Sequence, residues 1–173
     1  MPPEGNLNGP GAGCVTRTAR QAVITTGNLT MTPTQQELIR STWGQVTPIA
    51  DTAAQLFYER LFELDPALRR LFSRTDMDAQ RKNLVQTLTV VVKSIDKLDT
   101  VIPAVEGLGR RHAGYGVRPK HYATVGQALL DTLQTGLGDA FTRDARDAWG
   151  EAYELLAGLM IAAGEDSTSS AAA

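Results

Sequence analysis

The sequence predicts an all-α fold. Apolar residues recur at intervals of three and four along most of the chain, as at Leu84, Leu88 and Val91, and this spacing places them on one face of a helix. Signals that start and end helices separate these segments. The one β-branched run, residues 89–92, lies within the same helical period, so it gives no support to a strand.

Two cap-and-proline signals predict where the first helices begin. Residues 32–35 read Thr-Pro-Thr-Gln, which supplies an N-cap, a proline at the first helical position and a glutamine that completes a capping box. Residues 47–48, Thr-Pro, repeat the signal for a second helix. That helix is expected to end at residues 65–66, Asp-Pro, because proline disfavours helical geometry in the residue before it.

The later helices follow from similar signals. A short helical turn is expected to carry Phe72, and a long helix is expected over residues 77–98. The next helix carries His112 and is closed by glycines. Pro119 opens another helix, and Thr142 is a candidate cap for the last one.

Length and composition fit one globular domain. The 173 residues are 42% hydrophobic and 21% charged, which is enough for a full-sized core. Residues 1–30 contain many Gly and Pro and lack the apolar core of a secretory signal, so we expect a disordered N-terminal extension. The folded domain is expected over residues 31–164, followed by a flexible tail over residues 165–173.

Charge and cysteine content exclude several function classes. The net charge of -2 gives no broad basic field, so nucleic acid is not an expected partner. The longest apolar run near the C-terminus is about nine residues, short of the roughly twenty that span a bilayer, so no membrane partner is expected. The only cysteine, Cys14, excludes an internal disulfide, and a cytoplasmic location is expected.

His112 is the leading candidate for a functional residue. Val101, Val105 and Leu108 precede it by eleven, seven and four positions, so its side chain lies on an apolar helical face. A buried imidazole needs a partner, which can be a backbone carbonyl, a carboxylate or a metal. For a lone histidine the hydrogen-bonded core residue is the commoner case, so the rest of the site has to separate these alternatives.

Four upstream side chains have spacings that, on a helical chain, can form the opposite wall of a flat pocket. They are Tyr58, Phe72, Gln80 and Leu84. Such a pocket suits haem whose iron is bound by His112. Taken singly, Tyr58 and Phe72 are ordinary core aromatics and Gln80 is an exposed helix residue. The haem interpretation therefore rests on the whole set.

Six short motifs occur in an order that is typical of one family of haem proteins. Over roughly residues 32–163 they are Phe57-Tyr58, Leu71-Phe72, residues 108–117, His121-Tyr122, residues 125–127 and residues 148–153. The chain resembles the globin family, in particular bacterial single-domain globins and the haem domain of flavohaemoglobins, and more distantly neuroglobin. The resemblance implies the globin fold, in which helices A to H, with D short or absent, enclose haem b.

The resemblance also assigns roles to individual residues. His112 becomes the proximal iron ligand, and Gln80, thirty-two residues earlier, takes the distal position. Leu84, one turn after Gln80, is expected to restrict ligand access. The second histidine, His121, is expected to be exposed at a helix start rather than bound to iron. Three further side chains are expected to contact the haem: Phe72, Val117 and Tyr122.

The distal residues indicate gas binding. Dioxygen on ferrous haem carries partial negative charge, so hydrogen-bond donors in a dry pocket retain it. Tyr58 and Gln80 are such donors. We therefore expect the chain to bind dioxygen, or another small ligand such as nitric oxide.

Two other functions compete with gas binding. The first is nitric oxide dioxygenation, with Tyr58, Gln80 and Tyr122 as functional residues and a separate reductase as the electron source. In the family, a glutamate supports the proximal histidine, but the matching position here is Gly164, with Glu165 next to it, which weakens the enzymatic alternative. The second is a haem-based sensor of gas or redox state that acts through a partner.

Overall fold

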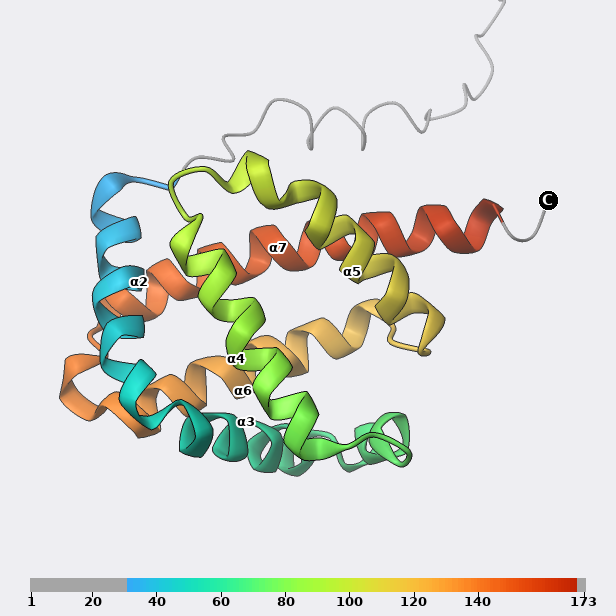
Figure 1. Cartoon of the computed structure of the whole chain (residues 1–173), viewed down its shortest axis with the longest axis horizontal. Helices are drawn as coiled ribbons and strands as arrows, with labels where there is room; N and C mark the ends of the chain where they lie inside the picture. The colour runs from blue at the N-terminus through green and yellow to red at the C-terminus, as the bar shows by residue number, and fades with distance from the viewer. Residues whose placement is uncertain (1–30, 171–173) are drawn as a thin grey trace, which may run out of the picture.

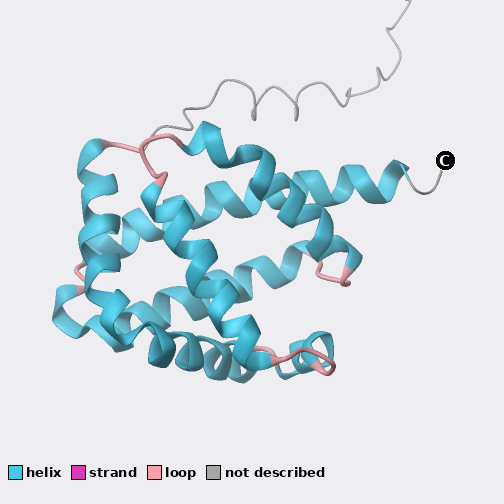
Figure 2. Ribbon diagram, in the orientation of Figure 1, coloured by secondary structure: helices cyan, strands magenta, loops and turns pink. Residues whose placement is uncertain are grey.

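The fold is helical throughout the part of the chain that the structure, a computed structural model, describes, residues 31–170 (Figure 1). Helices follow one another through short turns, and no strand occurs between residues 31 and 170 (Figure 2). The all-α prediction is confirmed. None of the described helices combines the length and the apolar character needed to cross a membrane. The predicted disordered extension, residues 1–30, lies outside the described residues.

The first two long helices start at the cap-and-proline signals. α2 (Pro33–Val46) is capped by Thr32, whose hydroxyl accepts from the Gln35 backbone N–H at 3.2 Å, while the Gln35 side chain accepts from the Thr32 N–H at 2.9 Å. The second signal opens a short 3-10 turn, η1 (Thr47–Ile49), from which α3 (Ala50–Leu64) continues. The helix predicted from residue 47 therefore begins as a 3-10 turn.

The middle of the chain differs from the prediction in one place. η2 (Pro66–Phe72) is the expected short turn of helix. α4 (Met77–Lys93) ends before the predicted residue 98, because the backbone leaves helical geometry at Ser94 (φ -104°, ψ 14°), a residue type that competes for backbone hydrogen bonds. The chain resumes as η3 (Leu98–Val101), which leads into α5 (Ile102–Gly114).

The last two long helices also begin at their predicted signals. α6 (Pro119–Leu137) is followed by η4 (Gly138–Ala140) and by α7 (Arg143–Ser170). Thr142 caps α7, since its hydroxyl accepts a backbone N–H from the first turn at 3.3 Å. α7 continues past residue 164, the predicted end of the domain, because residues 165–170 contain no glycine or proline to stop it.

One core joins the helices. α5 packs along α7 and α3 packs along α6, while α2 contacts α7 and α4 contacts α3 (Figure 1). Ile39, Leu61 and Ile95 are the most deeply buried large side chains. Inside the core, the indole Nε1 of Trp149 donates to the hydroxyl of Thr42 at 2.9 Å, which joins α7 to α2.

Candidate functional site

The candidate residues come from two separate groups of helices. Tyr58, Phe72 and Gln80 lie on α3, η2 and α4, and His112 and Tyr122 lie on α5 and α6. α4 packs mainly on α3 and α2, whereas α5 packs on α7, so α4 and α5 are not packed directly along each other (Figure 1). The candidate residues thus lie on two sets of helices, and we call Tyr58, Phe72 and Gln80 the first wall and His112 and Tyr122 the second wall.

Tyr58 and Gln80 form a polar pair on the first wall. Tyr58 is 5% exposed, and burial raises the pKa of its hydroxyl, while the nearby Gln80 side chain and the charge of Arg81 lower it. The Gln80 side chain itself is half-buried. A neutral phenol and an amide thus lie near each other on this wall, and both can donate a hydrogen bond.

Aromatic rings hold Tyr58 in place. The Phe72 ring packs edge-on against Tyr58 with centroids 5.6 Å apart, and against Phe62, also at 5.6 Å. The Arg69 guanidinium lies 4.8 Å above the Phe62 ring. Phe62 was not assigned to the site from the sequence, because its spacing on α3 is that of an ordinary core residue. Leu84, one turn beyond Gln80, is half-buried against the same core.

His112 is oriented by the backbone of its own helix. Its Nδ1 lies 2.9 Å from the carbonyl oxygen of Leu108, one turn earlier. Because a carbonyl can only accept, Nδ1 carries the proton and Nε2 presents a lone pair. Burial lowers the pKa of His112, the Leu108 bond opposes this effect, and the charge of Arg111 lowers the pKa further. The imidazole is therefore held neutral, which is the form that binds a metal.

Tyr122 and Val117 follow His112 on the second wall. The Tyr122 ring lies 6.5 Å from the His112 ring between centroids, and the side chain is 8% exposed. The Val117 backbone N–H donates to the His112 carbonyl at 3.0 Å, which fixes the loop between α5 and α6 to the end of α5. Burial raises the pKa of Tyr122, so its hydroxyl stays protonated.

A cavity of about 270 Å³ lies between α5, the start of α6 and α7. Val117, Tyr122, Gly164 and Glu165 are among the residues that line it. A β-carbon on Gly164 would lie 3.2 Å from that of Ala113, so the glycine allows α7 to pass close to α5. The carboxylate that reaches this cavity wall is that of Glu165, one residue beyond the position matched to the family glutamate, and its side chain is exposed.

The structure brings some of the predicted site residues into contact and leaves others apart. Tyr58, Phe72 and Gln80 form one cluster, and His112 and Tyr122 form another. Val117 lines the cavity that Tyr122 also borders, and Leu84 packs on the core. His121 is half-buried at the start of α6, where its Nδ1 accepts the Arg118 N–H at 3.1 Å. The Leu108 carbonyl was not assigned to the site from the sequence. Its position one helical turn before His112 indicates that it can accept a hydrogen bond from the imidazole.

These residues fit a haem group. Haem needs one axial ligand, apolar side chains on both faces and few charges within its pocket. The neutral imidazole of His112 has the form that an axial ligand requires, and the two walls contain the aromatic and aliphatic side chains that the haem faces require. The site thus has the character of a helical haem protein.

The comparison with protein families agrees with a helical haem protein. The Globin family model matches residues 55–160, which is more than half of the chain. The chain belongs to the globin family, and the predicted globin fold is confirmed.

Flavohemoproteins are among the similar curated proteins. The chain is 34% identical to the flavohemoprotein of Bacillus subtilis over 132 residues, which cover 75% of this chain and 33% of that protein. It is 33% identical to the flavohemoprotein of Vibrio cholerae over 126 residues, covering 72% of this chain and 32% of that protein. The chain therefore spans about a third of the length of these relatives, and the predicted resemblance to flavohaemoglobins is confirmed for that part.

Solved structures of bacterial globins have the same fold. An engineered carbene transferase built on a proposed nitric oxide dioxygenase of Rhodothermus marinus is 28% identical with a TM-score of 0.75, and the match covers 83% of this chain and 100% of that one. A bacterial globin from Campylobacter jejuni is 21% identical with a TM-score of 0.70, covering 80% of this chain and 99% of that one. The second likeness concerns the fold alone.

Proposed function

We propose that this globin binds haem b through Nε2 of His112 and retains dioxygen, or another diatomic gas such as nitric oxide, beside Tyr58 and Gln80. The observation that carries the proposal is the contact of His112 Nδ1 with the Leu108 carbonyl at 2.9 Å, which orients a neutral imidazole. The family match supports haem-based gas binding in general. The ligand and the distal donors are our own assignment.

Haem, when bound, supplies the iron at which a diatomic gas is held. The side chains near the iron determine how strongly the gas is held. The Tyr58 hydroxyl and the Gln80 amide each donate a hydrogen bond worth about 0.5–1.5 kcal/mol net to a ligand that carries partial negative charge. Two such bonds slow ligand release by about tenfold to a hundredfold. Phe72 and Leu84 exclude water from the same wall, which strengthens both bonds.

Optical spectra of the purified protein test the proposal. The ferric, deoxy-ferrous and gas-exposed forms should each give a distinct haem spectrum. His112→Ala should lose haem or hold it weakly, because it removes the proposed iron ligand. His121→Ala is the matched control, since that imidazole caps α6, and its spectrum should be unchanged. Equal haem loss in the two variants would reject His112 as the ligand.

Nitric oxide dioxygenation is the second candidate function. It is favoured by the match over the full length of the Rhodothermus marinus structure, which is described as a proposed nitric oxide dioxygenase. In this reaction one nitric oxide and one dioxygen combine with one electron to give one nitrate. Here the electron would come from a separate reductase protein. Nitrate yield per electron, measured with a reductase and nitric oxide, tests this activity, and gas binding without nitrate would exclude it.

A further inference from the structure

We propose that one end of the molecule is a docking face for an acidic, carboxylate-rich protein that donates electrons, an inference that rests on the proposed haem function. The face consists of the end of α5, the loop to α6 and η2. Its basic residues are Arg69, Arg70, Arg110, Arg111, Arg118 and Lys120. In the same region Tyr115 is exposed. We call this surface the basic face.

Positive charge is concentrated here although the chain as a whole is acidic. Residues 108–122 contain four Arg or Lys and no Asp or Glu, whereas the net charge of the protein is -2. Between residues 131 and 154, the balance is reversed, with six Asp or Glu against two Arg. The charge is therefore segregated between two regions, and this arrangement steers an oppositely charged partner toward one of them.

η2 and the loop between α5 and α6 lie together. A β-carbon on Gly116 would lie 3.7 Å from the Leu71 side chain, so the loop packs on η2. Asp65, which precedes η2, also acts electrostatically on His121 at the start of α6. Figure 1 shows η2 and the turn from α5 to α6 at the same end of the molecule. The two segments, which carry Arg69, Arg70 and Arg118, are therefore neighbours.

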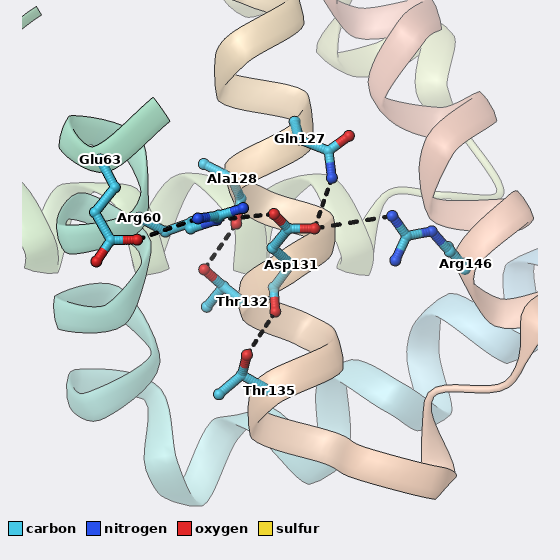
Figure 3. A network of polar contacts seen from close by, with 8 residues as sticks. All are labelled: Arg60, Glu63, Gln127, Ala128, Asp131, Thr132, Thr135 and Arg146. Atoms are coloured by element: carbon cyan, nitrogen blue, oxygen red, sulfur yellow. Dashed lines mark hydrogen bonds and ion pairs between the residues drawn. The ribbon is translucent and has the colours of Figure 1, made fainter. Parts of the chain in front are cut away.

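Most of these charges are not neutralised within the fold. Arg110 contacts Glu106 at 4.0 Å, but Arg111, Arg118 and Lys120 take part in no ion pair among residues 31–170. Elsewhere arginines are paired with carboxylates, as Figure 3 shows around Asp131 on α6.

Asp131 lies between two arginines. Its carboxylate accepts from Arg60 at 2.9 Å and from Gln127 at 2.6 Å, and Arg146 lies 3.8 Å away. Arg60 also contacts Glu63 at 3.1 Å. Arginines on this side are thus used within the protein, whereas Arg111, Arg118 and Lys120 of the basic face are available to a partner.

The exposed aromatic residue favours a protein as that partner. Tyr115 is 69% exposed, and a tyrosine among arginines is the composition enriched at protein interfaces. Residues 108–122 present no large exposed aliphatic side chain, which insertion into a lipid surface would need. The face also lies near the second wall, since the charge of Arg111 acts on His112. An electron donor docked here is therefore close to the proposed iron ligand.

The test uses the ferric haem-loaded protein and photoreduced flavodoxin, a small acidic flavoprotein, as the probe. Stopped flow measures the second-order rate of haem reduction at low and high salt. The double variant Arg118→Glu with Lys120→Glu should be reduced at least about tenfold more slowly at low salt and lose most of the salt dependence. Tyr115→Ala should also be slower. Reduction by dithionite, which needs no docking, should be unchanged in both.

Arg143→Glu is the control for a charge reversal outside the basic face. Arg143 is 91% exposed at the start of α7, far from the basic face along that helix (Figure 1). Its variant should be reduced by flavodoxin at the wild-type rate. Equal rates for the double variant and this control would overturn the proposal.

Two other results would also overturn it. One is a slower reaction that dithionite shares, because the effect would then lie at the haem. The other is binding of the protein to phosphatidylserine vesicles that the double variant abolishes while its flavodoxin rate is unchanged, because the face would then bind lipid. A wild-type protein without haem spectra would instead reject the proposed function itself, so the two failures are distinguishable.

Discussion

The carbonyl oxygen of Met160 lies where a side chain on Gly109 would have to begin. A β-carbon built on Gly109 would stand only 2.3 Å from that oxygen. α5 and α7 therefore cross with their backbones in contact, three residues before His112, and this crossing sets the position of the helix that carries the proposed iron ligand.

Gly109→Ala should lower the melting temperature and weaken haem retention. The new methyl group would meet backbone atoms, which cannot rotate away, so α5 has to shift relative to α7. We expect a loss of about 1–3 kcal/mol in the free energy of unfolding. Thermal unfolding followed by circular dichroism measures it.

Gly107→Ala is the control for this substitution. Its β-carbon would come no closer than 3.8 Å to Arg111 Nη1, so nothing opposes the methyl group. Since Ala is a better helix former than Gly, this variant should gain up to about 1 kcal/mol. Similar melting temperatures for the two variants would show that the contact at Gly109 is not tight.

Thr42→Val should destabilise the protein through Trp149. The substitution keeps the shape of the side chain but leaves the buried indole N–H of Trp149 without its acceptor. An unsatisfied buried donor costs about 1–3 kcal/mol, measurable by urea unfolding. Ser41→Ala, at an exposed position next to it, should change stability by less than about 0.5 kcal/mol. A neutral Thr42→Val would mean that Trp149 finds another acceptor.

Local chemistry explains which parts of the fold were predictable. The starts of α2 and α6 depend on residues within one turn, Thr32 with Gln35 and Pro119, so the sequence predicts them directly. The end of α4 at Lys93 was not predicted, because the apolar period continues to Ile95, which packs into the core from outside the helix. The period of apolar residues thus predicts which residues are buried more reliably than it predicts where a helix ends.

The site was predictable only in part for a related reason. The contact of His112 with Leu108 follows from helical spacing alone. The pairing of Tyr58 with Gln80 joins two helices, and the motif order, not the spacing, indicated it. The close approach at Gly109 depends on a residue fifty-one positions away and left no local signal.

Protein stability should fall as the pH drops below about 6.5, and His121 should contribute to this loss. Burial first, then the charges of Lys120 and Arg118, lower the pKa of His121, while Asp65 opposes them. The unfolded chain therefore binds a proton at higher pH than the folded one. The stability contributed by neutral His121 is present above the unfolded pKa and is lost as the pH falls toward the folded pKa.

His121→Asn tests this contribution. The Asn side chain retains an acceptor for the Arg118 N–H but does not titrate. Melting temperatures of wild type and variant are recorded across this pH range. The melting temperature of the wild type should fall more steeply on acidification than that of the variant. Parallel curves would assign the acid sensitivity to other groups, such as His112, whose pKa is also lowered.

Tyr58→Phe should raise the dioxygen dissociation rate by about three- to tenfold, because it removes one hydrogen-bond donor while nearly preserving the ring and its packing on Phe72. Gln80→Leu should act in the same direction. In the double variant the combined logarithmic effect should be less than the sum of the two single effects, since neighbouring side chains that meet the same ligand do not act independently.

Carbon monoxide provides the control within the same three proteins. It carries less negative charge than dioxygen, so its dissociation should change far less when a donor is lost. Stopped-flow measurements with both gases separate a polar effect from a steric one, because a looser pocket would speed the release of both. If dioxygen leaves Tyr58→Phe at the wild-type rate, the hydroxyl does not reach the ligand, and Gln80 alone would have to account for any retention.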